Sequence, residues 1–140
     1  MYTIASKTVD LGGFVGLRLN EHALHSWDVE VTVDRSAGLA PEPTAVIVDG
    51  LELVVRFTGK PTGTEHRVAV RTADPTRHLV ISFGTDSVSL DSGDPDDEPD
   101  LELQAEAFVR LVYGRLDPDH TPAVSGPADL DALRRAFPGP

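Results

Sequence analysis

The stretch HRVAVRTADPTRHLVISF, residues 66–83, decides the fold, because it holds two runs of alternating apolar residues on either side of a turn. The runs extend from His66 to Thr72 and from His78 to Phe83. The apolar residues that share one face are Val68 and Val70 in the first run and Leu79, Ile81 and Phe83 in the second. This alternation predicts two half-buried antiparallel strands.

Two further strands are expected downstream. Val88 and Leu90 continue the alternation, and residues 101–103 form a shorter alternating run. Between them, residues 91–100 read DSGDPDDEPD, with six acidic residues and two prolines, which favours an exposed loop. A calcium-binding loop is the sharper alternative, but the EF-hand order of ligands is absent and the prolines interrupt the run.

A long helix is expected ahead of the strands. It fits residues Gly13 to Val33, with Asp10 as a candidate N-cap. Residues 34–43, DRSAGLAPEP, end it with a run of helix-breaking residues.

Three more segments favour helices. Thr44 to Phe57 fits both a helical stripe and a strand-like alternation, and its length favours a helix that stops at Gly59. Ala105 to Leu116 and Ser125 to Phe137 each carry apolar residues along one side. In the last of these, Pro127 suits the first helical turn. The expected fold class is α+β, with one long N-terminal helix followed by a small antiparallel sheet flanked by helices.

The composition excludes several classes of function. The chain has 140 residues, a net charge of −11 and no cysteine. Disulfides and thiolate metal sites are therefore excluded, so any metal needs histidine and carboxylate ligands. The acidity disfavours nucleic acids and anionic membrane surfaces as partners. The sequence shows neither a membrane-spanning apolar run nor a secretory signal, so a cytoplasmic location is expected.

The long helix carries polar residues beside its apolar stripe. At about 100° per residue, Arg18, Glu21, His25 and Asp28 fall within an arc of roughly 80°. Glu21 and His25 are four residues apart and can share one divalent cation, while Asp28 can orient the imidazole. The same spacing is also typical of a weak ion pair on a solvated surface.

A zinc site needs at least a third protein ligand. The remaining histidines that could supply one are His66, His78 and His120, and each is expected to be exposed. On the sequence alone, Glu21 and His25 are therefore two candidate ligands of an incomplete site.

Two segments resemble a known family. GLRLNEHALHSWDVEV, residues 16–31, resembles the last helix of the metal-binding bundle in mycothiol-dependent maleylpyruvate isomerase family proteins. RLVYGRLDPDHTPAVSGPADLDALRRAFPG, residues 110–139, resembles the C-terminal ending of many members. The resemblance covers the first helix and the last third of the chain, and the middle only by its pattern.

The resemblance implies a function and a division of the chain. Glu21 and His25 match the E-x-x-x-H pair that holds a divalent metal, usually zinc, in a DinB-like bundle, and Arg115 matches a functional arginine. Residues 1–36 would be the last bundle helix, and residues 37–140 a C-terminal domain similar to sterol-carrier folds. The earlier helices and the third ligand are absent, which implies a truncated or split member.

Two functions are therefore expected as alternatives. In the first, the chain is part of a mycothiol-dependent isomerase or transferase and is not catalytically complete alone, with Arg115 steering an anionic small-molecule substrate. In the second, it is a non-catalytic module that binds a small ligand or acts as a scaffold, with a vestigial metal motif. The apolar side of the first helix predicts docking on the α+β unit, a homodimer or association with a helical-bundle chain.

Overall fold

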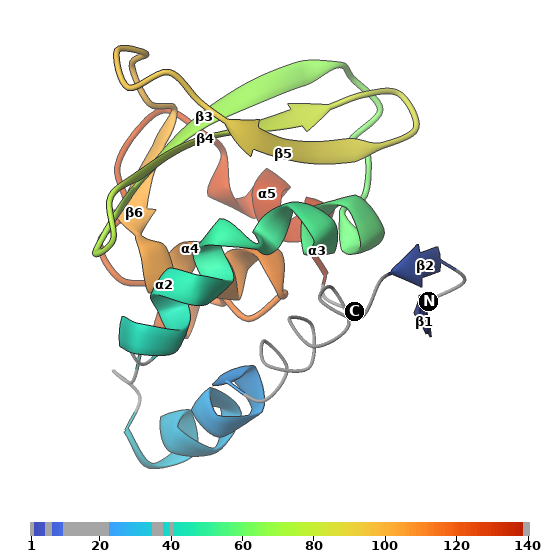
Figure 1. The fold of residues 1–140 in the computed structure, drawn as a ribbon. Coiled ribbons are helices and arrows are strands. Elements are labelled where there is room, and N and C mark those ends of the chain that lie inside the picture. Colours follow the sequence, from blue (N-terminus) through green and yellow to red (C-terminus); the bar gives the residue numbers. More distant parts are fainter. Residues whose placement is uncertain (1, 5–6, 10–22, 35–37, 40, 139–140) are drawn as a thin grey trace.

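A computed structural model describes residues 2–4, 7–9, 23–34, 38–39 and 41–138 of the chain. It shows an α+β fold, in which a curved four-stranded sheet lies over a layer of helices (Figure 1). The helices cover one face of the sheet and no helix lies on its other face in this part of the chain (Figure 1). The α+β class predicted from the sequence is confirmed.

The sheet has the strand order β5-β4-β3-β6 and is mixed. β3 (His66–Ala73), β4 (Arg77–Phe83) and β5 (Val88–Ser92) form an antiparallel meander, as predicted. β6 (Leu101–Gln104) instead runs parallel to β3, so the prediction of a wholly antiparallel sheet is wrong. The reason is the loop at 93–100, which carries the chain from β5 to the far side of β3. Alternation of apolar residues in a short strand predicts which face is buried, but it does not predict whether the strand runs parallel or antiparallel to its neighbour.

The alternating faces of the strands are confirmed. The inner face packs against the helices and contains the buried residues Val68, Val70, Ile81, Phe83, Val88, Leu90, Leu101 and Leu103. Burying these side chains provides the main favourable term for folding.

The ambiguous segment from Thr44 to Phe57 is helical, but it forms two helices. α2 (Pro41–Asp49) and α3 (Leu51–Thr58) meet at Gly50, which has the lowest helix propensity of any residue except proline. Gly59 ends α3 as predicted, and its backbone N–H bonds back to the last turn at 2.9 Å.

The two C-terminal helices are shorter than predicted. α4 (Ala105–Val112) is almost entirely buried, and a 3₁₀ turn, η1 (Pro118–His120), follows it. α5 (Leu130–Ala136) starts only after Asp129, whose side chain caps the helix by accepting a backbone N–H of the first turn at 3.1 Å. Pro127 therefore lies ahead of the helix and not in its first turn.

The N-terminal part differs most from expectation. β1 (Tyr2–Ile4) and β2 (Lys7–Val9) form a two-stranded antiparallel hairpin that the sequence pattern did not predict. Residues 23–33 are helical, but the rest of the expected helix from Gly13 lies outside the described residues, so one long helix is not supported. The boundary at 36/37 also falls in residues outside the description and stays a prediction.

One exposed ion pair joins α2 to the sheet. Arg77 donates from Nε and Nη2 to the two carboxylate oxygens of Asp49, at 2.6 and 3.1 Å. These hydrogen bonds lower the pKa of Asp49, against a smaller opposing effect of burial. Since the folded pKa lies below the unfolded value, the stabilisation is present at neutral pH and is lost as the pH falls through the lowered pKa.

We predict that Gly126→Ala destabilises the protein much more than Gly63→Ala. Both glycines have positive φ, of 104° and 90°, so both substitutions carry a backbone cost of about 1 kcal/mol or more. A Cβ on Gly126 would also meet the carbonyl of Asp100, whereas a Cβ on Gly63 meets nothing within 4 Å. Chemical denaturation should show an extra loss of about 2 kcal/mol for Gly126→Ala. Equal losses would contradict the close approach of these two segments.

Candidate functional site

The helix at 23–33 is anchored to the α+β unit by two buried side chains. Leu24 is 1% exposed and Trp27 is 5% exposed, as expected for residues on the apolar side of this helix. The guanidinium carbon of Arg110, from α4, lies 4.9 Å from the centre of a Trp27 ring. A cation over an indole face at this distance is attractive, more so where water is excluded.

Arg110 is itself buried, and its charge is balanced by Glu106 one helical turn earlier. Its Nε and Nη2 donate to the two carboxylate oxygens of Glu106, at 2.7 and 2.9 Å. Glu106 also accepts the backbone N–H of Leu39 at 3.3 Å. A buried charge without such partners would be strongly destabilising. These contacts therefore allow the Arg110 guanidinium to stay buried against the Trp27 ring.

The turn after α4 directs the side chain of Arg115 toward the helix at 23–33. Gly114, at φ 72°, occupies the left-handed position just after the C-cap Tyr113. The N–H of Gly114 donates to Leu111 O at 3.1 Å, and the N–H of Arg115 donates to Arg110 O at 2.7 Å. This is a Schellman motif, which glycine favours because it has no Cβ. It reverses the chain and fixes where the Arg115 side chain begins.

Arg115 forms a two-pronged ion pair with Asp28 of the helix at 23–33. Its Nε and Nη2 lie 2.9 and 3.1 Å from the two carboxylate oxygens, and its Nη1 donates to Tyr113 O at 3.1 Å. The side chains are partly exposed, at 23% for Arg115 and 39% for Asp28. The fork geometry of arginine suits this pairing, which a single-point contact of lysine would not reproduce.

His25 lies against the same carboxylate. Its Nδ1 is 3.5 Å from Asp28 Oδ2, so Asp28 stands between His25 and Arg115. This separation is that of an ion-pair contact, and the orienting role suggested for Asp28 stays a prediction. The His25 side chain is 70% exposed, however, so its expected position beside the apolar stripe does not shelter it in this structure.

The candidate metal site is only partly described. Glu21, the other predicted ligand, lies outside the described residues, as does Arg18. Among the residues that are described, no three His, Cys, Asp or Glu side chains come together as a metal-binding group. Of the two predicted ligands the structure describes His25, whose Nδ1 lies 3.5 Å from Asp28 Oδ2, and the metal site stays a prediction.

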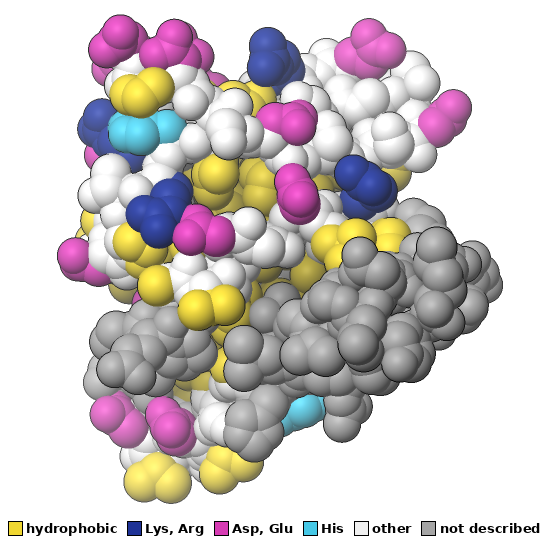
Figure 2. All heavy atoms as spheres, viewed as in Figure 1, with side chains coloured by type: hydrophobic (Ala, Val, Ile, Leu, Met, Phe, Trp, Pro, Cys, Tyr) yellow, Lys and Arg dark blue, Asp and Glu magenta, His cyan; other side chains and the backbone are white. Residues whose placement is uncertain are grey.

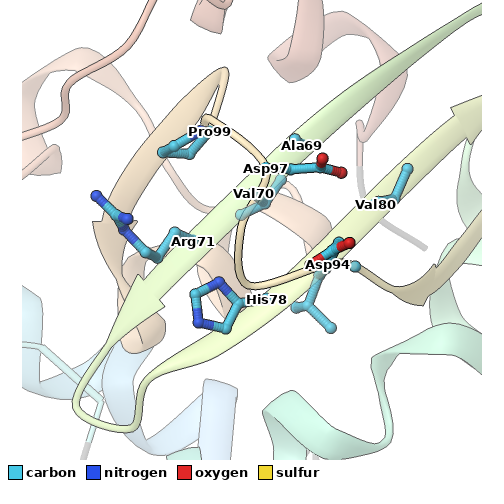
Figure 3. A pocket seen from close by; sticks show the side chains of 10 residues that line it. Ala69, Val70, Arg71, His78, Val80, Asp94, Asp97 and Pro99 are labelled. Carbon is cyan, nitrogen blue, oxygen red and sulfur yellow. The ribbon is translucent and has the colours of Figure 1, made fainter.

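Two of the other candidate histidines, His66 and His78, lie in the sheet, and His120 is the last residue of η1. His66 opens β3 and is exposed, as predicted, whereas His78, near the start of β4, is half-buried and not exposed as expected. His78 lines a small cavity on the outer face of the sheet together with Arg71, Asp94 and Asp97 (Figure 3). Its volume of about 10 Å³ holds no more than a single water molecule, so it is not a ligand site.

A larger hollow lies at the other end of the sheet, and sequence reasoning did not place it. It measures about 360 Å³ and is bordered by the start of β3, by Phe83 of β4 and by the first turn of α5. Four parts of the chain that are distant in sequence contribute to it, including Asp100, so no local motif could have revealed it.

The comparisons with known proteins give no functional assignment. No family model and no solved structure matches the chain. Two uncharacterized proteins of Mycobacterium tuberculosis are similar to it, Rv1260 of strain H37Rv and MT1298 of strain CDC 1551. Each is 30% identical over 96 residues, which is 67% of this chain and 26% of the relative. The aligned segment thus spans about a quarter of the length of these relatives.

No helix in the described part of the chain is both long and apolar enough to cross a bilayer.

We predict that Asp28→Ala and Arg115→Ala both loosen the helix at 23–33 without unfolding the sheet. A double-mutant cycle should give a coupling energy of about 1 kcal/mol, because the pair is two-pronged but partly solvated. Amide hydrogen exchange within 23–33 should rise in each single variant and rise no further in the double variant. Asp131→Ala, which removes an exposed partner of Arg134 inside α5, is the matched control and should leave this helix unchanged. Additive effects of Asp28→Ala and Arg115→Ala would contradict the pairing.

Proposed function

We propose that this chain contributes Glu21 and His25 to a divalent-metal site, with zinc as the preferred ion. The site would belong to a mycothiol-dependent isomerase or transferase related to the maleylpyruvate isomerase family. The chain would not be catalytically complete alone. The observation that supports this proposal is the series Arg115–Asp28–His25, in which a carboxylate held by an arginine lies 3.5 Å from Nδ1 of the candidate ligand.

In this proposal Arg115 positions the ligand and does not touch the substrate. All three of its guanidinium nitrogens donate within the protein, two to Asp28 and one to Tyr113 O. We therefore replace the substrate-steering role expected from the sequence with a positioning role. A bound divalent cation supplies Lewis acidity and favours the deprotonated form of a thiol such as mycothiol. The chain's own part is to hold Nε2 of His25 in place.

A further protein surface is needed to complete the proposed site. One stripe of the helix at 23–33 is exposed. It contains His25, Val29 and Val33, which are spaced by four residues and are 70%, 69% and 89% exposed. Apolar side chains are visible on the surface of this helix in Figure 2. A helix of a bundle protein, or of a second copy of this chain, that covered the valines would bring its own ligands close to His25. We expect this assembly in the cytoplasm.

A second candidate function is supported by the hollow beside β3. Its volume of about 360 Å³ falls in the range of small-molecule pockets, and apolar side chains line much of it. In this alternative the chain is a non-catalytic module that binds a small ligand, and its metal motif is vestigial.

Metal uptake by the full chain tests the first proposal. We expect wild-type protein to bind Co²⁺ or Zn²⁺ weakly, with release of protons, in calorimetry and in the visible spectrum of the cobalt form. Glu21→Ala and His25→Ala should each weaken metal uptake at least about tenfold. Asp28→Asn should weaken it about tenfold, because removing a residue that contacts a metal ligand typically lowers metal affinity 10–100-fold. His78→Ala, which alters a histidine of the sheet, is the control and should bind as wild type does. Uptake that is absent, or that is unaffected by Glu21→Ala and His25→Ala, would contradict the proposal.

A further inference from the structure

The hollow of about 360 Å³ lies at an edge of β3 that β6 leaves open. β6 pairs with β3 only from Val70 onward. One residue earlier, Ala69 donates its N–H to Asp100 Oδ2 at 2.9 Å and accepts the N–H of Asp100 at 2.8 Å. The hydrogen-bond ladder on this edge therefore ends at Ala69, and the hollow begins where a longer β6 would have continued.

The open edge presents one main-chain donor and one acceptor. Along an antiparallel strand, backbone groups point to its two neighbours in alternation. Since the N–H and C=O of Ala69 point away from β4, those of Arg67, two residues earlier, point the same way, toward the hollow that Arg67 lines. Beyond the ladder between β3 and β4, no main-chain hydrogen bond of Arg67 is found within the part of the chain that is described.

The walls of the hollow suit an apolar group. Val68, Phe83 and Leu133 are buried side chains that line it. The His66 ring stacks on Phe83, with ring centres 4.5 Å apart and planes at 9°, and its Nδ1 lies 3.0 Å from the carbonyl oxygen of Thr64. These contacts fix the first residue of β3, so the edge at Arg67 is held in an extended conformation before any ligand arrives.

The charge of the hollow selects among ligands that have these features. Asp100 and Asp129 both line it, and the whole chain carries a net charge of −11. A ligand with a free carboxylate would be repelled, whereas a neutral ligand would not. The Arg67 side chain does not offset this, because it alternates with the buried Val68 and so projects from the outer face of the sheet.

We propose that this hollow binds a neutral, N-acylated peptide unit in an extended conformation. Its N–H and C=O would pair with the C=O and N–H of Arg67, as one residue of an added strand does, and its apolar side chain would lie between β3 and α5. The open edge is one residue long, so a single blocked residue suffices. This inference sharpens the ligand-binding alternative above and does not depend on the metal site.

Titration of the full ¹⁵N-labelled chain with N-acetyl-leucinamide tests the proposal. Saturable shifts are expected at the amides of Arg67 and Ala132, on the two sides of the hollow. N-acetyl-N-methyl-leucinamide lacks the donor N–H and should bind at least about tenfold more weakly. N-acetyl-glycinamide, which lacks the apolar side chain, and N-acetyl-leucine, which carries a carboxylate, should also bind more weakly. No saturable binding, or equal binding of the N-methylated ligand, would overturn the proposal.

Protein variants separate the backbone of Arg67 from its side chain. Arg67→Pro removes the N–H at an edge position, where proline is tolerated, and should weaken binding about fivefold or more. Arg67→Ala keeps both main-chain groups and should bind as wild type does. Ala132→Phe fills the hollow from α5 without touching the strand and should abolish binding, which keeps the test decisive if Arg67→Pro misfolds.

Loss of binding in Arg67→Ala to the same extent as in Arg67→Pro, or unchanged binding in Ala132→Phe, would overturn the proposal. Zinc uptake measured on the same samples distinguishes its failure from failure of the metal proposal, because the two sites share no residue.

Discussion

The docking of the helix at 23–33 on the end of α4 is the constraint on which the candidate site depends. Trp27 is buried against a guanidinium, and that guanidinium, of Arg110, is buried in turn. Glu106 stabilises the arrangement, because it balances the charge of Arg110 with two short hydrogen bonds. The helix at 23–33 is thus held by three successive contacting groups, Trp27, Arg110 and Glu106. Since Arg110 and Glu106 belong to α4, the position of α4 determines the position of this helix.

The ion pair between Arg115 and Asp28 is a second contact between the helix at 23–33 and the α+β unit. Because it is separate from the contact of Trp27, it restricts rotation of the helix about its axis. Trp27 and Asp28 are adjacent in sequence, so the first anchors the helix while the second meets the arginine that leaves the turn at Gly114. His25 lies about one turn earlier on the same side as Asp28. A structural contact between two parts of the chain therefore also places Asp28 beside the imidazole that we propose as a metal ligand.

Local sequence patterns predicted most of the elements but not their long-range relations. The alternation of Val68 and Val70 identified β3, and the apolar stripe of α4 identified a buried helix, because burial leaves a periodic signature in a single segment. The parallel direction of β6 and the break at Gly50 did not follow from periodicity. The Asp28–Arg115 pair spans 87 residues, and the hollow beside β3 is lined by four distant parts of the chain. Relations of this kind arise only when the chain folds, so spacing within one segment cannot reveal them.

We propose that Asp28, fixed by Arg115, holds the imidazole of His25 so that Nε2 faces a metal ion. Long-range ¹H–¹⁵N NMR of the histidine side chains tests it most directly, because it reports the tautomer and any metal contact of each ring nitrogen. We expect neutral His25 to carry its proton on Nδ1 and zinc to perturb Nε2 of this residue selectively. A proton on Nε2, together with no response of His25 to zinc, would contradict it.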